Sequence, residues 1–533
     1  MTNDQSDLYS NGLRKYLLAK NLKKDLSASI VVFLVALPLC LGIALASGAP
    51  LFSGILSGII GGIVVASFSG SQLSVSGPAA GLTVIVFNAI TTLVSFDSFL
   101  LAVFIAGLIQ IVLGILKAGV IGSYFPNSVI IAMLAAIGII LILKQLPYAV
   151  GYDFGYKNNQ EIIPFNNEST FTALFSVFSK FSSGAILICS ISLIILIVWP
   201  KIKKLEIIPA PLIVVVFGII SSQILANTNI ALKLNQLVNI PVVDNFNDFK
   251  GLFTFPDFTQ FKNPKLWTIA LTIAVVASLE TLLSLEAVDK MDPIKRVSPT
   301  NKELIAQGIG NSLAGLVGAL PMTAVIVRSS ANVNAGGRTK LSAIFHGIFL
   351  ILAVFFIPQL INKIPLSCLA AILLMVGYKL TKLSLFKKMW QDGLDQFIPF
   401  IVTIIAVIFT DLLIGVGIGL VVGIMFLLVK NYRNPYFYTI DKSEGENMIR
   451  IKLAQEVSFL NKGAIQFTLS KLPSHQKVII DGSQSLFIDQ DVLDTIQDFV
   501  QNAHTRDIVV ELINIKAKYD VPELDELIID QKQ

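Results

Sequence analysis

The sequence has few of the residues from which metal sites and catalytic centres are built. Its 533 residues include only three histidines and three cysteines. The histidines are scattered along the chain, at His346, His475 and His504. The cysteines lie far apart in separate apolar segments, at Cys40, Cys189 and Cys368. We therefore expect no metal site, no cofactor and no Ser/His/Asp or Cys/His catalytic set, and we expect that the protein is not an enzyme.

Charged residues are also scarce. They make up 14% of the chain, whereas hydrophobic residues make up 54% and the mean hydropathy is +0.75. Soluble domains carry about 25% charged residues, so this composition indicates that most of the chain lies in lipid. The formal net charge is only +5. We expect the lipid bilayer as the surroundings of the chain, and no nucleic-acid partner.

Long apolar runs, in contrast, fill most of the sequence. A helix that spans a bilayer needs about 20 apolar residues, or fewer where it is short or broken, and on that rule the chain has about fourteen candidates. The candidates are Ala28–Ser47, Ser53–Phe68, the broken Val75–Ile90, Phe99–Leu116, Ser128–Leu143, Ala185–Trp199, Pro211–Leu225, Trp267–Ala287, Leu304–Leu320, the broken Thr323–Asn334, Leu341–Ile357, Pro365–Tyr378, Phe397–Thr410 and Leu412–Val429. The sequence thus predicts an all-α polytopic membrane protein, with its membrane domain at residues 28–430.

The basic residues predict the orientation of these segments. An even number of spans places both termini on one side, and the short loops of that side hold many lysines and arginines, among them Lys290, Lys295, Arg296 and Lys340. By the positive-inside rule both termini, including a lead-in at residues 1–27, should be cytoplasmic, as in a multi-pass protein of the plasma (inner) membrane. Two longer loops, at residues 144–181 and 227–265, should face outward.

Two of the apolar segments are interrupted. Ser76, Gly77 and Pro78 break the first, and we predict extended chain there, followed by a short helix from about Ala79. Pro321 precedes the second, for which Thr323 is the predicted helix cap. Half-helices that start inside a membrane present unpaired N–H groups and a positive dipole end, which favour an anion. The two breaks lie about 240 residues apart, and so do the first segments of the two proposed repeats, 28–226 and 267–430.

Two charged residues lie within apolar segments. Glu280 is deep in TIALTIAVVASLETLLSLEAV, with Ser284 one turn later on the same helix face. An intramembrane carboxylate suits a group that carries a proton or binds a sodium ion, which would then be the coupling ion. Arg328 lies in the second broken segment, where it could attract an anion. The structural alternative for both residues is an ion pair between them, or a capping role for Glu280.

The chain changes character after Lys430. Short apolar runs, MIRIKL, KVIID and DIVVELI, alternate with an amphipathic helical stretch at Asp491–Ala503. Strands that alternate with helices predict a small α/β domain, which we place at residues 447–525 on the cytoplasmic side.

These features together resemble the SulP family of anion permeases. ALPLCLGIALASGAPLFSGILSGIIGG looks like the first two helices of that family, QLSVSGPAAGLTVIV like its third and SLETLL like its eighth. NSLAGLVGALPMTAVIVRSSANVNAGGRTKLSAIFHG looks like its ninth to eleventh helices. In the C-terminal domain, DGSQSLFIDQDVLDTI is similar to the strand–loop–helix of a STAS domain.

The resemblance implies fourteen segments in two inverted repeats of seven, with a core domain that moves against a gate domain. It also implies a homodimer, and a STAS-like domain that docks a cytoplasmic partner or supports the dimer. One anion would lie between the third and tenth helices. Carried over by position, its cradle comprises Ser76, Gly77, Ala79, Ala80, Ala324, Val325, Ile326 and Arg328.

The resemblance also bears on substrate and coupling. Sodium-coupled bicarbonate members have an Asp, a hydroxyl residue and a Thr at the positions of Glu280, Ser284 and Ile326. The loss of the Thr weakens the sodium case, and Glu is closer to proton-coupled members. Similarity to the subgroup associated with carbonic anhydrases favours bicarbonate without excluding sulfate. In the STAS-like loop Asp489 is followed by Gln490 and not by Ser, so we expect no phosphoserine switch there.

Small inorganic oxyanion transport, of bicarbonate or sulfate, is therefore the leading functional hypothesis. A nucleobase–cation symporter of the same fold is one alternative, although Ala324, Val325 and Ile326 offer no polar side chain to read a base. A membrane-anchored signalling or scaffold protein that acts through its STAS-like domain is the other.

Overall fold

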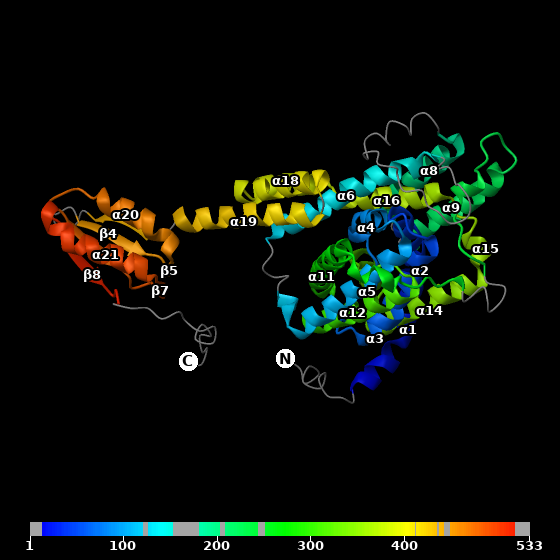
Figure 1. The fold of residues 1–533 in the computed structure, drawn as a ribbon, viewed down its shortest axis with the longest axis horizontal. Coiled ribbons are helices and arrows are strands. Elements are labelled where there is room, and N and C mark those ends of the chain that lie inside the picture. The colour runs from blue at the N-terminus through cyan, green and yellow to red at the C-terminus, as the bar shows by residue number, and fades with distance from the viewer. Residues whose placement is uncertain are drawn as a thin grey trace. The chain divides into compact units, whose positions relative to one another are not determined.

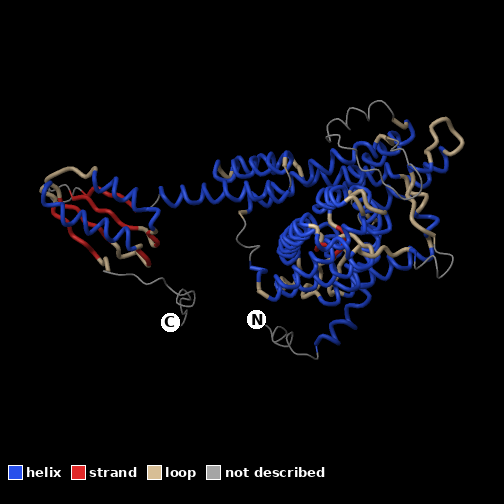
Figure 2. Tube along the Cα trace, viewed as in Figure 1, coloured by secondary structure: helices blue, strands red, loops and turns tan. Residues whose placement is uncertain are grey.

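The computed structural model describes residues 13–120, 126–152, 181–202, 208–242, 251–410, 412–433, 436–441 and 448–516 (Figures 1 and 2). The chain forms two compact units. The first comprises residues up to Gln391 together with Phe400–Ile418, and the second comprises Asp392–Pro399 together with the chain from Gly419 onward.

Helices make up almost all of the first unit, and the unbroken apolar runs of the sequence fall on them, with the run Ser53–Phe68 divided between α2 and α3. They are α1 (Leu13–Ala46), α2 (Leu51–Ile60), α3 (Ala66–Phe68), α4 (Thr83–Leu93), α5 (Phe96–Ile115), α6 (Asn127–Ala149), α8 (Ser183–Val198), α9 (Ala210–Leu225), α11 (Pro264–Met291), α12 (Thr300–Val317), α13 (Ile326–Asn334), α14 (Leu341–Phe356), α15 (Pro358–Ile361), α16 (Leu366–Leu380), α17 (Leu383–Gln391), α18 (Leu394–Phe409) and α19 (Leu412–Arg433), of which the last two extend into the second unit.

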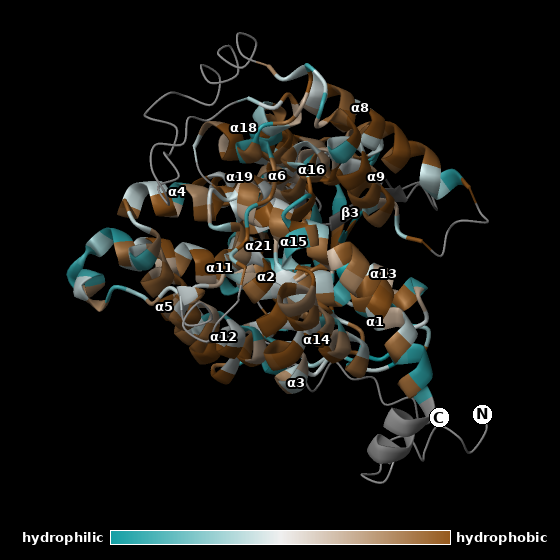
Figure 3. Ribbon diagram, turned by 90° about the vertical axis from the view of Figure 1, so that its right-hand side faces the viewer, coloured by the Kyte–Doolittle hydropathy of each residue, from teal (hydrophilic) through white to brown (hydrophobic). Residues whose placement is uncertain are grey.

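The apolar character of these helices explains their abundance. In hydrocarbon a backbone N–H or C=O has no water to bond, so a spanning segment must satisfy these groups within itself. Seven helical stretches in the described residues are long and apolar enough to cross a bilayer, and five further apolar helices are 10–17 residues long. Figure 3 shows the corresponding ribbons coloured mostly as hydrophobic.

Two helix ends differ most from the sequence prediction. Helix α1 begins at Leu13, so it reaches back into the predicted lead-in. Helix α6 continues to Ala149, six residues past the predicted end at Leu143. The placement of Lys144 in an outward loop was therefore wrong. Lysine lowers the local hydropathy, so a hydropathy scan ends the apolar segment there. Its long alkyl chain nevertheless packs well on apolar surface, so the helix can continue past it.

Small residues bring the central helices together. Gly107 of α5 faces the backbone of Ser312 in α12, and Gly315 of α12 faces the backbone of Phe104 in α5. A side chain at either glycine would push the two helices apart. Close approach at small residues is the usual way in which membrane helices gain packing energy, because lipid offers no hydrophobic driving force between them.

A widened turn interrupts the helix that precedes the first broken segment. Between α2 and α3 the residues Gly61–Val65 form a single turn of π-helix. The backbone of Ser76 lies where a side chain on Gly61 would be. π-turns of this kind occur frequently at functional sites, and here the turn admits the first broken segment into the helix bundle.

The second unit contains a small α/β domain. Its four-stranded sheet has the order β3 (Tyr436–Asp441), β4 (Met448–Leu453), β6 (Lys477–Asp481) and β8 (Val509–Ile513), with β3 antiparallel and the others parallel. A parallel pair, β5 (Glu456–Val457) and β7 (Phe487–Ile488), and the helices α20 (Lys462–Ser470) and α21 (Gln490–Asn502) complete it. The three predicted strands and the predicted helix are confirmed. Residues 517–525 of the predicted domain lie outside the described residues.

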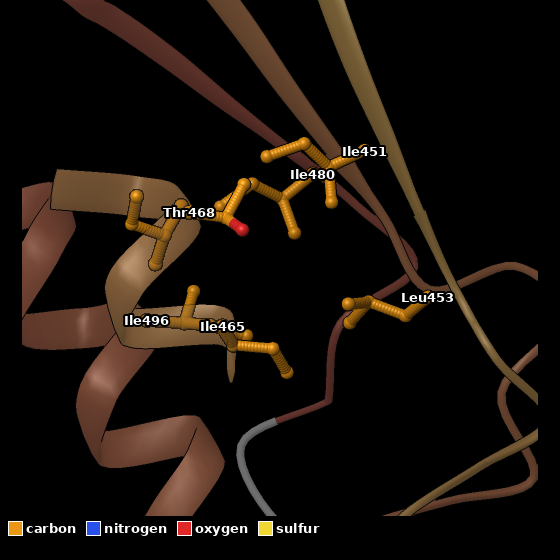
Figure 4. Close-up of a pocket in the computed structure, with 7 residues that line it drawn as sticks. Ile451, Leu453, Ile465, Thr468, Ile480 and Ile496 are labelled. Atoms are coloured by element: carbon orange, nitrogen blue, oxygen red, sulfur yellow. The ribbon is translucent and has the colours of Figure 1, made fainter. Parts of the chain in front are cut away.

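The interior of this domain is apolar. Between the sheet and the two helices lies a cavity of about 10 Å³, lined by side chains such as Ile451, Leu453, Ile480 and Ile496 (Figure 4). A cavity of that size holds one water molecule at most, and an apolar lining gives water no hydrogen-bond partners. This cavity is therefore a packing defect and not a ligand site.

Candidate functional site

The two broken segments meet as a pair of short strands inside the helix bundle (Figure 2). Strand β1 (Ser76–Pro78) pairs antiparallel with β2 (Met322–Ala324), with Ser76 opposite Ala324, Gly77 opposite Thr323 and Pro78 opposite Met322. Proline has no N–H and disfavours helix in the residue before it, so both segments are extended here. Mutual pairing satisfies backbone groups that neither segment could satisfy alone.

Each strand leads directly into a helix. After β1 a 3₁₀ turn at Ala80–Leu82 continues into α4, close to the predicted start at Ala79. After β2, α13 begins at Ile326. No side chain caps the N-terminus of either α4 or α13. The first-turn N–H groups of α13 therefore lack side-chain partners, the arrangement that favours an anion, whereas in the turn before α4 the N–H of Gly81 donates to the Glu280 carboxylate.

The predicted cap of the second helix was wrong. Thr323 lies within β2, where its Oγ1 donates to the carbonyl of Ala324 at 3.2 Å, and the residue at the cap position is Val325. Strand pairing with β1 takes up the three residues after Pro321, which delays the start of the helix. The sequence motif for a cap cannot reveal a pairing partner that lies 250 residues away.

All eight predicted cradle residues lie at this strand pair or in the turns that follow it. Five of them are buried, namely Ser76, Gly77, Ala79, Ala324 and Arg328. Ala80 and Val325 are half-buried, and Ile326 is 36% exposed. The accessible part of the cradle therefore lies at Ala80, in the turn before α4, and at the start of α13, and not along the strands themselves.

Arg328 lies directly beneath the first strand. Its side chain is fully buried, and Nη2 donates to the carbonyl of Pro78 at 3.4 Å. Nη1 occupies the space that a side chain on Gly77 would fill. Within the described residues Nε and Nη1 have no hydrogen-bond partner, and Arg328 makes no ion pair. The positive charge is therefore held at the strand pair without a counter-charge.

Glu280 lies on the other side of the site. Its carboxylate packs against Gly81 in the turn before α4 and accepts a hydrogen bond from the backbone of that residue. Oε2 has no partner among the described side chains and backbone groups. Ser284 is buried one turn later on α11. In the described part of the chain Glu280 and Arg328 do not form an ion pair with each other.

A buried polar row on α12, which our sequence analysis missed, holds both strands in place. Gln307 Nε2 donates to Ser76 Oγ of β1 at 2.6 Å. Asn311 accepts from the N–H of Met322 at 2.7 Å and donates to its carbonyl at 3.0 Å, so it binds both backbone groups of one residue in β2. Glu303, Gln307 and Asn311 follow one another at four-residue spacing, which places them on one face of α12. That spacing was the available signal.

The polar row also connects β2 to the helix that carries Glu280. Asn311 Nδ2 donates to Gln110 Oε1 at 2.7 Å, and Gln110 Nε2 donates to Ser278 Oγ on α11 at 3.2 Å. Thr281, the neighbour of Glu280, accepts from the N–H of Ala324 at 3.3 Å. A movement of α11 would therefore strain or break hydrogen bonds that hold β2.

Side chains of the second broken segment bind the backbone of the first. Ser329 Oγ accepts from the N–H of Val75 at 3.0 Å, and Asn332 Nδ2 donates to the carbonyl of Leu73 at 3.0 Å. The N–H of Val325 adds a bond to the carbonyl of Val75, also at 3.0 Å. These bonds extend the contact between the two segments beyond the paired strands.

Comparison with known proteins places this architecture among anion transporters. A family model described as the sulfate permease family matches residues 22–405. The chain is 29% identical to a putative sulfate transporter, YvdB, of Bacillus subtilis, over 79% of this chain and 76% of that protein. It is 24% identical to the bicarbonate transporter BicA of Picosynechococcus sp., over 85% of this chain and 78% of that protein.

Solved structures agree with this placement. The transmembrane domain of a cyanobacterial bicarbonate transporter, BicA, superposes with a TM-score of 0.62 at 25% identity, covering 76% of this chain and 97% of that domain. The murine anion transporter Slc26a9 in the inward-facing state superposes with a TM-score of 0.73, covering 93% of this chain and 86% of that one. At 15% identity the second likeness shows the fold alone.

Proposed function

Because the chain belongs to the sulfate permease family, we propose that it is a secondary active transporter of one small inorganic oxyanion, bicarbonate or sulfate. The observation that supports this most strongly is the β1–β2 pair, which sets the first turns of α4 and α13 beside the buried Arg328. Neither helix has a side-chain cap, and Arg328 has no ion-pair partner within the described residues. Membership in this family of anion transporters means that the chain is a multi-pass membrane protein. The substrate and the mechanism are our proposal.

The geometry suits an oxyanion in particular. Carbonate- and sulfate-type ions carry several acceptor oxygens, so one ion can accept from the N–H groups of two helix ends at once. The fields of both helix dipoles and of Arg328 add at the same point. The side chains there, of the half-buried Ala80 and the exposed Ile326, are apolar and leave the backbone amides as the recognising groups.

We propose alternating access as the transport mechanism. In this scheme fourteen segments form two inverted repeats, and the repeat halves that contain α4 and α13 form a core that moves against a gate. Broken helices that meet at a midplane site are typical of such transporters. The polar row on α12 keeps the strand pair intact during that movement. The α/β domain is a cytoplasmic STAS-like domain in this proposal, both termini are cytoplasmic, and the transporter is a plasma-membrane homodimer.

Glu280 is the proposed coupling residue. Its carboxylate touches the turn before α4, so binding of a proton or a sodium ion there changes the charge beside the anion. A neutralised Glu280 repels an incoming anion less than a charged one does. Occupation of the two sites is therefore favourable together, which is the requirement for symport.

Uptake of labelled bicarbonate and sulfate into proteoliposomes tests the proposal, with and without sodium and a pH gradient. We expect uptake of at least one anion by the wild type and a loss of at least about tenfold in Arg328→Ala, since a charged hydrogen-bond donor contributes about 1.5–3 kcal/mol. Glu280→Gln should uncouple uptake from the ion gradient. Glu286→Gln is the matched control, because Glu286 lies on the same helix but pairs with Lys290 on an exposed face. Normal coupled transport by both site variants would contradict the assignment.

A further inference from the structure

Lys144 is a second cation near the site, and the anion cradle does not include it. It lies on α6, with its side chain directed toward α4, where Nζ is 3.6 Å from the centre of the Phe87 ring. Nζ is buried and has no hydrogen-bond partner in the part of the chain that the structure describes. Phe87 is itself held from behind at Gly48, where a positive φ of 64° and the lack of a side chain allow the ring to pack closely.

The surroundings of Lys144 do not compensate its charge. Within the described residues it makes no ion pair. A cation over an aromatic ring gains about 2 kcal/mol when desolvated, whereas the loss of hydration of a buried ammonium group costs several kcal/mol. Charged residues in membrane segments are accordingly rare, and where they occur they have a partner. No partner for this charge lies within the described residues, and a bound anion would supply one.

Its position relative to the cradle indicates what that partner is. Phe87 follows the first residue of α4, Thr83, by four residues, which is about 6 Å along a helix. Helix α6 also packs against the 3₁₀ turn at Ala80–Leu82, next to the cradle. Lys144 thus stands about one helical turn past the cradle, toward the end of α4 at Leu93. An anion on that side would meet Lys144 close to the cradle.

We propose that Lys144 forms a second, transient subsite for the transported oxyanion, on the route between the cradle and the Leu93 end of α4. In the absence of the anion its ammonium group rests on the face of Phe87. When the anion passes, the ammonium group exchanges the ring for a charge-assisted hydrogen bond with the anion. This inference rests on the proposed function, since it assigns a further binding residue to the same transported ion.

Transport kinetics of three full-length variants in proteoliposomes test the subsite, with labelled bicarbonate and sulfate as probes. Lys144→Met, which keeps the length and removes the charge, should raise the KM for the transported anion about tenfold, as expected for one lost charge near the ion. Lys144→Arg should stay within about threefold of the wild type. Phe87→Leu removes the resting place but not the charge, so it should not raise KM.

A chemical rescue distinguishes lost charge from lost folding. Lys144→Cys should also have a raised KM, and modification with a cationic aminoethyl thiosulfonate should lower it again, whereas a neutral reagent of the same length should not. The native cysteines are buried, which favours reaction at the new thiol. An unchanged KM in Lys144→Met, or equal effects of Lys144→Met and Phe87→Leu, would overturn the subsite while transport by the wild type stands. If the wild type transports neither anion, the proposed function fails and the subsite fails with it.

Discussion

The two broken segments have the same backbone form but contribute different chemistry. Each consists of a three-residue strand followed by a helix with an uncapped N-terminus. The first, Ser76–Leu93, has no charged residue and supplies space, because Gly77 admits Arg328 and Gly81 admits Glu280. The second, Met322–Asn334, supplies the side chains, since Arg328 reaches the backbone of the first, and Ser329 and Asn332 reach the backbone just before it. In a site of this kind one segment must have small residues, so that the charged side chains of its neighbours have room.

The largest expected effect comes from releasing the second strand. Asn311→Leu removes both bonds to the backbone of Met322 and leaves buried N–H and C=O groups unpaired, at about 1–3 kcal/mol for each group. We expect a strong loss of thermal stability and of anion transport. Gln307→Leu is the matched variant for the first strand. It removes the bonds to the Ser76 hydroxyl and to the Glu303 carboxylate but leaves no backbone group of the strand unpaired, so its effect should be smaller.

Thermal unfolding in detergent, together with uptake in proteoliposomes, measures both variants. Equal losses would mean that the two strands are anchored equally, and the division of roles between the segments would then be wrong.

Filling the space in the first segment should have the next largest effect. A methyl group in Gly77→Ala would occupy the position of Arg328 Nη1 and displace the guanidinium group. Overpacking of this kind costs about 1–3 kcal/mol, and here the displaced group is the proposed anion attractor. We expect uptake to fall by at least about tenfold. This fall should exceed the loss of folded protein. Gly417→Ala serves as the control, because a side chain there meets no neighbouring atom within 4 Å.

If Gly77→Ala transported as well as Gly417→Ala does, close contact between the first strand and Arg328 would not matter for function.

The smallest expected effect is a pH dependence at the far end of the second segment. There Arg296 donates to the Arg338 carbonyl at 3.0 Å and is itself held by Asp292, with Nε 2.6 Å from Oδ2. Burial alone would raise the pKa of Asp292, but hydrogen bonds from Arg296 and the N–H of Ile294 outweigh it and hold the pKa below its ordinary value. This stabilisation is complete above the ordinary aspartate pKa of about 3.9, and it is lost as the pH falls through the lower folded value.

Thermal unfolding of the wild type and of Asp292→Asn across acidic pH checks this prediction. The variant should be less stable at pH 6, and the two curves should converge at the acid end. A difference that stays constant with pH would show that the ion pair does not act through protonation of Asp292.

The sequence was most informative where a local rule determines structure. Proline disfavours helix, so the two breaks beside Pro78 and Pro321 could be predicted, and so could the strands and the helix of the α/β domain. Proline alone does not decide this, because Pro38, Pro147 and Pro399 lie inside helices. The contacts of Gly81 with Glu280 and of Asn311 with Met322 could not, because each depends on packing between segments distant in the chain. Thr323 and Lys144 were misplaced for the same reason. A cap motif carries no information about strand pairing. A hydropathy scan carries none about an aromatic ring with which a lysine can form a cation–π contact.

Protection of Ile326 tests the central claim most directly, because this residue is the exposed start of α13. The measurement is the rate at which a small thiosulfonate reagent modifies Ile326→Cys, with and without the transported anion. The three native cysteines are buried, so they should react slowly. The account predicts that saturating anion slows the reaction several-fold in Ile326→Cys and that adding Arg328→Ala abolishes this protection. A rate unchanged by an anion that the protein demonstrably transports would contradict an anion site between the first turns of α4 and α13.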